Sequence, residues 1–304
     1  MKENRKIKKR NLFRRSLLYV PGNMPRMLHS ILSFDMDTII IDLGDAVRPE
    51  NKLAARILVR NFLKTYDFGD VEVFIRINQI DSPYGFEDLK MLLPEMPDGI
   101  RLPRSTHMSL IKEVDMYISQ IEDELEVEDG RFSIIASIDT AIGVLNVQQI
   151  AQSSSRICAL AFDAEHYTLD LGIERTKENE SLLFARMQVL LTAKAMNIDA
   201  IDTIFSDVYD EEGLIQETRH AKSLGFTGKS LISPRQIIPV HNVFAPTKKE
   251  IEFAQRIISA AEQARKRRIG VISLDGKLVD SPAISRAELT LKMARDLGLV
   301  MENE

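Results

Sequence analysis

The chain has 304 residues, 44% of them hydrophobic, which is enough to bury a substantial core in one large domain or two ordinary ones. Its single cysteine, Cys158, excludes an intrachain disulfide framework and favours a reducing, cytoplasmic location. The net charge is −5, although the N-terminal segment is basic. We expect no membrane span, which would need ~20 apolar residues, and no signal peptide. We also expect no aromatic surface of the kind that binds nucleic acid.

Short apolar runs alternate along the chain with longer segments whose apolar residues recur at helical spacing. Eight runs are predicted to be strands: 16–20, 37–42, 71–77, 99–103, 133–138, 157–162, 199–205 and 229–233. The helical segments between them include 52–63, 109–125, 179–196 and 211–225. This alternation fits a closed (β/α)₈ TIM barrel better than an open doubly wound sheet, and no GxGxxG motif follows the first strand. We therefore predict an α/β chain of the TIM-barrel class.

The C-terminal part of the chain extends beyond the eight predicted units. A charged amphipathic helix, a hairpin with Asp275-Gly276 at its turn and a second helix are predicted there. A barrel needs no such extension, so we expect it to contact a neighbouring subunit or to cover the barrel mouth. The predicted organisation is a basic tail (1–13), a catalytic barrel (14–245) and a helical arm (246–304).

Polar side chains cluster at the ends of the predicted strands, which meet at one mouth of such a barrel. Carboxylates facing arginines resemble a divalent-metal site beside an anion pocket, because oxygen ligands hold Mg²⁺ and guanidinium groups bind carboxylates. The alternative for each acid is a cap on the following helix. We expect a small acid or its thioester to bind there, through Arg15, Arg76, Asn78 and Arg104.

Several stretches of sequence are distinctive: RRSLLYVPGN (14–23), DLGDAV (42–47), IRIN (75–78), RLPR (101–104), LLFAR (182–186), GFTGKSLISPRQI (225–237), APTKKEI (245–251) and GVISLDGKLVDSP (270–282). Together they resemble the citrate lyase β-subunit family of the HpcH/HpaI-type aldolase superfamily, over nearly the whole chain. The resemblance implies cleavage of a citryl thioester to oxaloacetate and an acetyl thioester by retro-aldol chemistry. It also implies Mg²⁺ on two carboxylates and a substrate-gripping arginine, which is Arg76 here.

Four residues depart from that family pattern, and all lie on the predicted rim. Asp139 stands in place of a Glu ligand, His166 in place of an Asp ligand, Asp163 in place of a Gly and Gly44 in place of a Glu. In one account the site is rebuilt, with Asp139, His166 and Asp163 holding a metal. In the other, the barrel is catalytically silent and serves as a scaffold or binds an acidic metabolite.

We predict the first account, a carbon–carbon lyase of the citrate-lyase-β type. Arg76 binds the substrate carboxylate and Asp45 orients it or accepts a proton. The metal is Mg²⁺, or Mn²⁺ or Zn²⁺ because of the imidazole. The acyl group is expected on CoA or on the phosphopantetheine of an acyl carrier protein. Expected partners are that carrier, other lyase subunits and further copies of the chain in a trimer or hexamer.

Overall fold

The computed structural model describes residues 13–176, 180–267 and 272–300. The predicted basic tail, 1–13, therefore lies outside the described residues except for Phe13. The chain divides into two compact units, residues 1–240 and 241–304. This division falls inside helix α10 (Ile237–Phe244), whereas the predicted arm begins at 246.

The first unit is a closed barrel of eight parallel strands in chain order, with β1 pairing both β2 and β8. The TIM-barrel prediction is confirmed. The strands are β1 (Ser16–Pro21), β2 (Thr38–Asp42), β3 (Glu72–Arg76), β4 (Gly99–Leu102), β5 (Ser133–Ile138), β6 (Ile157–Phe162), β7 (Asp199–Asp202) and β8 (Gly228–Leu231).

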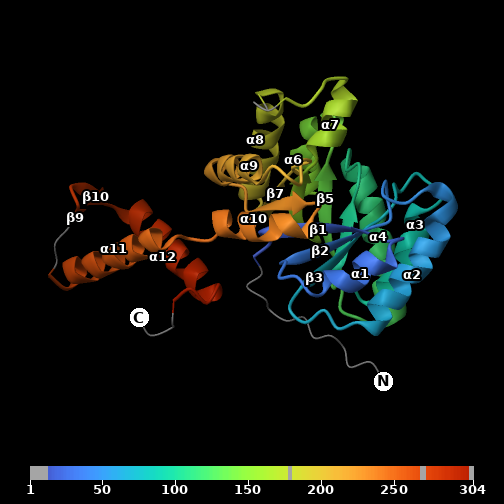
Figure 1. Ribbon diagram of the computed structural model, residues 1–304, viewed down its shortest axis with the longest axis horizontal. Coiled ribbons are helices and arrows are strands. Elements are labelled where there is room, and N and C mark those ends of the chain that lie inside the picture. Colours follow the sequence, from blue (N-terminus) through green and yellow to red (C-terminus); the bar gives the residue numbers. More distant parts are fainter. Residues whose placement is uncertain (1–12, 177–179, 268–271, 301–304) are drawn as a thin grey trace. The chain divides into compact units, whose positions relative to one another are not determined.

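Helices surround these strands (Figure 1). They are α1 (Pro25–Ile31), α2 (Lys52–Thr65), α3 (Gly85–Leu92), α4 (Met108–Leu125), α5 (Ala141–Leu145), α6 (Val147–Ala151), α7 (Ala164–Leu171), α8 (Glu180–Ala195), α9 (Glu211–Leu224) and α10. None of the helices in the described part of the chain combines the length and apolar character that crossing a bilayer requires.

The interior of the barrel changes from apolar to polar along the strands. Side chains two residues apart on a strand face the same side. The interior layer before the C-terminal ends of the strands is apolar and is formed by Leu17, Ile40, Phe74, Ile135, Ala159, Ala161 and Ile201. Two residues further along the same strands come Tyr19, Asp42, Arg76, Ser137, Asp163 and Thr203. The strands thus place a polar layer at their C-terminal ends, where barrel enzymes hold their sites.

The second unit has a hydrophobic core of its own. It consists of α11 (Lys248–Arg267), the antiparallel hairpin β9 (Ile272–Leu274) and β10 (Lys277–Val279), and α12 (Ser281–Asp296). Ala254 and Ile257 of α11 pack with Val279 and Ala287 to form this core. The predicted helix, hairpin and helix are therefore present in the predicted order.

Candidate active site

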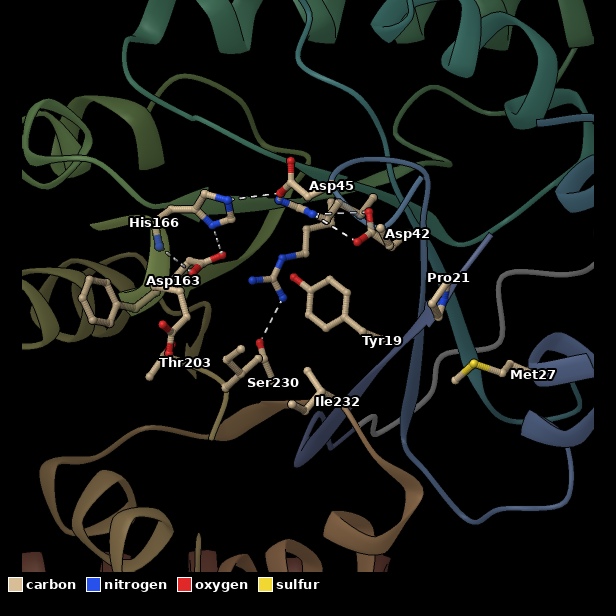
Figure 2. A pocket seen from close by; sticks show the side chains of 16 residues that line it. Tyr19, Pro21, Met27, Asp42, Asp45, Asp163, His166, Thr203, Ser230 and Ile232 are labelled. Carbon is tan, nitrogen blue, oxygen red and sulfur yellow. Dashed lines mark hydrogen bonds and ion pairs between the residues drawn. The ribbon is translucent and has the colours of Figure 1, made fainter. Parts of the chain in front are cut away.

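A cavity of about 310 Å³ opens at the C-terminal ends of the strands. Its walls combine a few apolar side chains with carboxylates, arginines and one imidazole (Figure 2). The lining residues are Tyr19, Pro21, Met27, Asp42, Asp45, Ala46, Arg76, Arg101, Phe162, Asp163, Glu165, His166, Thr203, Ile204, Ser230 and Ile232.

Arg76, at the end of β3, is held by two carboxylates, that of Asp42 at the end of β2 and that of Asp45 in the loop that follows. Its Nη1 lies 3.1 Å from Asp42 Oδ2, and its Nη2 lies 2.6 Å from Asp45 Oδ2. Arg76 is buried, and its hydrogen bonds are charge-assisted and therefore strong. The guanidinium is thus fixed in place with its charge largely compensated before any substrate binds.

Gly44 and Lys52 fix the loop that carries these carboxylates. The Gly44 N–H donates to Asp42 Oδ1 at 2.7 Å. Lys52 Nζ donates to the carbonyls of Leu43 and Gly44, both at 2.7 Å. A Cβ at position 44 would lie 3.1 Å from Arg76 Nη1 and 3.1 Å from Asp42 Oδ1, so glycine leaves room for the ion pair.

His166, in the first turn of α7, lies between two carboxylates from different loops. Its Nδ1 is 3.0 Å from Asp163 Oδ2 and its Nε2 is 3.1 Å from Asp45 Oδ2 (Figure 2). These hydrogen bonds, the one to Asp163 first, raise the pKa of His166 to about 10. The hydrogen bond from His166 in turn lowers the pKa of Asp45. His166 is therefore an imidazolium with both nitrogens engaged, which differs from its predicted role as a metal ligand.

Asp139 and Asp163 follow neighbouring strands, and they are brought together by the pairing of Ile138 with Phe162. Asp139 is 2% exposed, and its Oδ2 accepts from the Arg104 N–H at 2.9 Å while Oδ1 is buried with no hydrogen-bond partner. Burial first, and then the charge of Asp163, raise the pKa of Asp139 to about 6.

Asp163 is both a helix cap and part of the charged cluster. Its Oδ1 accepts from the His166 N–H at 3.3 Å, which caps α7, while Oδ2 binds the imidazole. Burial opposes ionisation of Asp163, but the hydrogen bond from His166 keeps its pKa below the ordinary value. The two functions expected as alternatives, capping and site chemistry, are thus combined in one side chain.

Two carboxylates are candidates to hold a metal at this site. Asp163 lines the cavity, whereas Asp139 is not among the lining residues. Within the described residues, no three His, Cys, Asp or Glu side chains are grouped so that they could hold a metal ion. Zn²⁺ requires three or four protein ligands, whereas Mg²⁺ is commonly held by one or two carboxylates together with water and substrate. The buried Oδ1 of Asp139, which has no hydrogen-bond partner, fits a hard cation of the second kind.

Three residues predicted to bind substrate are placed differently from the expectation. Arg15 precedes β1, at the opposite end of the barrel, where its side chain binds Asp37 at 2.7 and 2.8 Å. Asn78 donates from both its backbone and its side chain to Asp88. Arg104 contributes its backbone N–H to Asp139 while its side chain is exposed. None of the three lines the cavity, so the structure does not bring them to the site.

Four further residues line the cavity without having been assigned a function in the predicted site: Tyr19, Asp42, Arg101 and Ser230. The signal that could have found them is the two-residue alternation along each strand. Arg101 stands directly opposite Arg76 in the register of β3 with β4, so it faces the same interior. Fold and site together define a barrel whose mouth is equipped to bind and polarise an anionic substrate.

Comparison with known proteins agrees with this class. A model of the HpcH/HpaI aldolase/citrate lyase family matches residues 15–234. The citrate lyase subunit beta of Leuconostoc mesenteroides subsp. cremoris is 41% identical, covering 94% of this chain and 95% of the relative. That of Haemophilus influenzae is 40% identical, with 93% and 97% covered. The chain belongs to the HpcH/HpaI aldolase/citrate lyase family.

A solved structure extends the likeness to the fold. Protein CitE from Mycobacterium tuberculosis, in complex with magnesium, acetoacetate and coenzyme A, is 26% identical with a TM-score of 0.77. The match covers 92% of this chain and 98% of that one. These relatives are named as lyases, which favours an enzyme. The alternative, a catalytically silent scaffold, was open because four residues depart from the family pattern.

Proposed function

We propose that the protein cleaves a citryl thioester into oxaloacetate and an acetyl thioester. The observation that carries this proposal is the chain of contacts at the barrel mouth, in which Asp42, Arg76, Asp45, His166 and Asp163 bind one another in sequence. It holds Arg76 and His166 in fixed positions at the barrel mouth, in a family whose relatives include citrate lyase subunits.

The reaction sets definite demands on these residues. The carbinol hydroxyl loses its proton, the bond from the carbinol carbon to the thioester methylene breaks, and the carbinol carbon becomes a ketone. The bonding electron pair passes to the methylene carbon, which takes up a proton and becomes the acetyl group. Preorganised positive charge stabilises the oxygens that gain charge. Arg76 binds the carboxylate beside the new ketone, and Asp45, ionised at neutral pH, orients Arg76 and His166.

We assign the metal position to Asp139 and Asp163, with Mg²⁺ as the ion. The support is the buried Oδ1 of Asp139, which has no hydrogen-bond partner. Bound there, Mg²⁺ would supply a Lewis acid for the developing keto oxygen. His166 fits a different role, because both of its ring nitrogens are already bonded to carboxylates. The reason for preferring Mn²⁺ or Zn²⁺ is thereby removed.

The carrier and the partners are part of the proposal. The phosphopantetheine arm of CoA or of an acyl carrier protein would bring the acyl group to the mouth, and other lyase subunits would supply the carrier. We also propose a homo-oligomer, a trimer or a hexamer, and the exposed apolar residues Phe184 and Leu191 of α8 support association of this kind. The single cysteine supports a cytoplasmic location.

The test is an assay of the purified chain with citryl-CoA or citryl-acyl carrier protein and Mg²⁺, with oxaloacetate measured by a coupled reduction to malate. We expect oxaloacetate and acetyl thioester in equal amounts. Absence of both products with both carriers would overturn the proposal.

Two variants make the metal assignment specific. In Asp139→Asn we expect activity to fall by more than about 100-fold, since loss of an outer partner alone costs about 10- to 100-fold. Added Mg²⁺ should raise the unfolding temperature of the natural protein and not that of this variant. Asp199→Asn is the matched control, because Asp199 begins β7 at the opposite end and binds Arg14. An unchanged Mg²⁺ response in Asp139→Asn would contradict the assignment.

A further inference from the structure

Arg101 of β4 is a buried guanidinium inside the cavity, 1% exposed. Its Nε donates to Ser137 Oγ at 3.0 Å, and its Nη1 donates to Ser230 Oγ at 3.1 Å. Its guanidinium carbon lies 4.9 Å from the centre of the Tyr19 ring, within cation–π range. Figure 2 shows Ser230 and Tyr19 facing the middle of the cavity, where the hydrogen bond to Ser230 is drawn.

Arg101 differs from other buried arginines in its partners. Arg56, Arg156 and Arg186 each form ion pairs with carboxylates, and so does Arg76. Among the described residues, Arg101 forms no ion pair with a carboxylate and has two hydroxyl groups and an aromatic ring instead.

A buried charge outside an ion pair is costly, and burial of this kind is usually compensated by pairing. The charge of Arg101 lowers the pKa of Asp163 on the same cavity, but the two side chains form no ion pair. Hydroxyl groups and a ring hold the guanidinium in position but do not neutralise it. The same side chain lines the cavity into which a substrate would enter. The arrangement therefore fits an anion that is supplied by the ligand.

A citryl thioester brings two free carboxylates, one on the carbinol carbon and one at the end of a carboxymethyl arm. Arg76 is a partner for the first, beside the reacting carbon. A related thioester with a methyl group in place of the carboxymethyl arm has one free carboxylate, and it leaves Arg101 without a carboxylate to pair with. The cost of leaving the guanidinium unpaired discriminates between the two substrates.

We propose that Arg101 binds the second carboxylate of the substrate and makes the site selective for acyl thioesters with two free carboxylates. This inference rests on the proposed citryl thioester cleavage and names the residue that sets its substrate class. Ser137, Ser230 and Tyr19 act as positioning residues, since they hold the guanidinium from three different strands.

The experiment compares kcat/KM for citryl-CoA and citramalyl-CoA in the natural protein and in Arg101→Gln. We expect the citryl-CoA value to fall on the order of 10- to 100-fold, the worth of a hydrogen-bonded charge, while the citramalyl-CoA value changes less than about threefold. An equal loss with both substrates, or an unchanged preference for citryl-CoA, would overturn the inference.

Arg186→Gln is the matched control, because Arg186 is also a buried arginine but binds Asp202 outside the cavity. We expect it to lower the unfolding temperature without changing the ratio of the two kcat/KM values. If Arg101→Gln fails to fold, Arg101→Lys replaces it, because lysine keeps the positive charge but lacks the planar guanidinium. This variant should show a smaller loss of kcat/KM than expected for Arg101→Gln, and for citryl-CoA alone. A lysine variant with the natural preference would count against the inference.

Binding of the product separates this inference from the proposed reaction. Oxaloacetate has two carboxylates and pyruvate has one, and calorimetry measures both without catalysis. If the natural protein cleaves no thioester, the proposed function fails. The role of Arg101 then stands when Arg101→Gln weakens oxaloacetate binding and leaves pyruvate binding unchanged, and it falls when both change alike.

Discussion

At the scale of single residues, His166 has an unusual position between two acids. Its imidazolium brings a positive charge to the mouth of the barrel. Asp163 lies three residues before it on the chain and returns a negative charge to the same place. The two side chains therefore compensate each other electrostatically, and removal of either one leaves the other without its partner.

The charge state of His166 is a testable consequence. Its pKa in the folded protein is raised from 6.5 to about 10, so binding of the proton favours the folded state. This contribution to the free energy of unfolding is fully present below pH 6.5 and is lost as the pH rises toward about 10. We expect an NMR titration in EDTA to show the His166 imidazole still protonated at pH 8, with its signals assigned by their absence in His166→Gln.

Asp163→Asn is the control for that titration. It removes the charge of Asp163, whose hydrogen bond is the main cause of the raised pKa of His166. It leaves a side-chain oxygen that can cap α7. The pKa of His166 should fall in this variant while the helix is kept. A His166 that titrates at or below its ordinary pKa in the natural protein would show that the two carboxylates do not hold an imidazolium.

At the scale of elements, α8 carries large apolar residues on its exposed side as well as on its buried side. One side packs on β6 and β7, yet Phe184 is 59% and Leu191 is 61% exposed, seven residues apart on one face. Exposed apolar side chains that share a face mark interaction surfaces. We propose that this face is a contact between copies of the chain.

We expect Phe184→Glu combined with Leu191→Glu to shift the protein to a smaller oligomer, measured by light scattering after gel filtration, because two buried charges oppose association. The barrel should keep its circular dichroism. Met116→Glu, which changes one exposed apolar residue on α4, is the control and should leave the molecular mass unchanged. An unchanged mass in the double variant would exclude this face as the contact.

The strands and helices could be predicted from sequence because each depends on a local pattern. The run 133–138 and the helix 109–125 were expected within one residue of their observed bounds. The ion pair between Glu217 of α9 and Lys229 of β8, at 2.6 Å, could not be predicted in the same way. Such a contact depends on how a helix packs against the barrel, and the spacing of apolar residues does not report it.

At the scale of the whole molecule, barrel closure could be predicted from eight regular repeats, whereas the contacts inside it could not. Arg101 and Ser230 are 129 residues apart in sequence and meet only because β4 and β8 close one barrel. Arg15 was expected at the mouth, but it precedes its strand and lies at the other end. Which end of a strand a residue occupies decides its function in this fold.

The second unit, residues 241–304, which contains the predicted arm, should unfold separately because it has a core of its own. Ile257→Ala leaves a cavity in that core and should lower the free energy of unfolding of the arm by about 2–4 kcal/mol. Hydrogen exchange followed by mass spectrometry should show faster exchange in α11 and α12 and unchanged exchange in β1 to β8. Ile40→Ala, in the barrel core, should give the reverse pattern. Equal acceleration in both units would show that they unfold together.

The crowding around Gly44 has a consequence for any substitution at this position. A Cβ there would lie 3.1 Å from both Arg76 Nη1 and Asp42 Oδ1. Any residue other than glycine would therefore require the ion pair between Arg76 and Asp42 to shift. The arginine, the aspartate and the glycine depend on one another, so a change at one of these positions calls for an adjustment at the others.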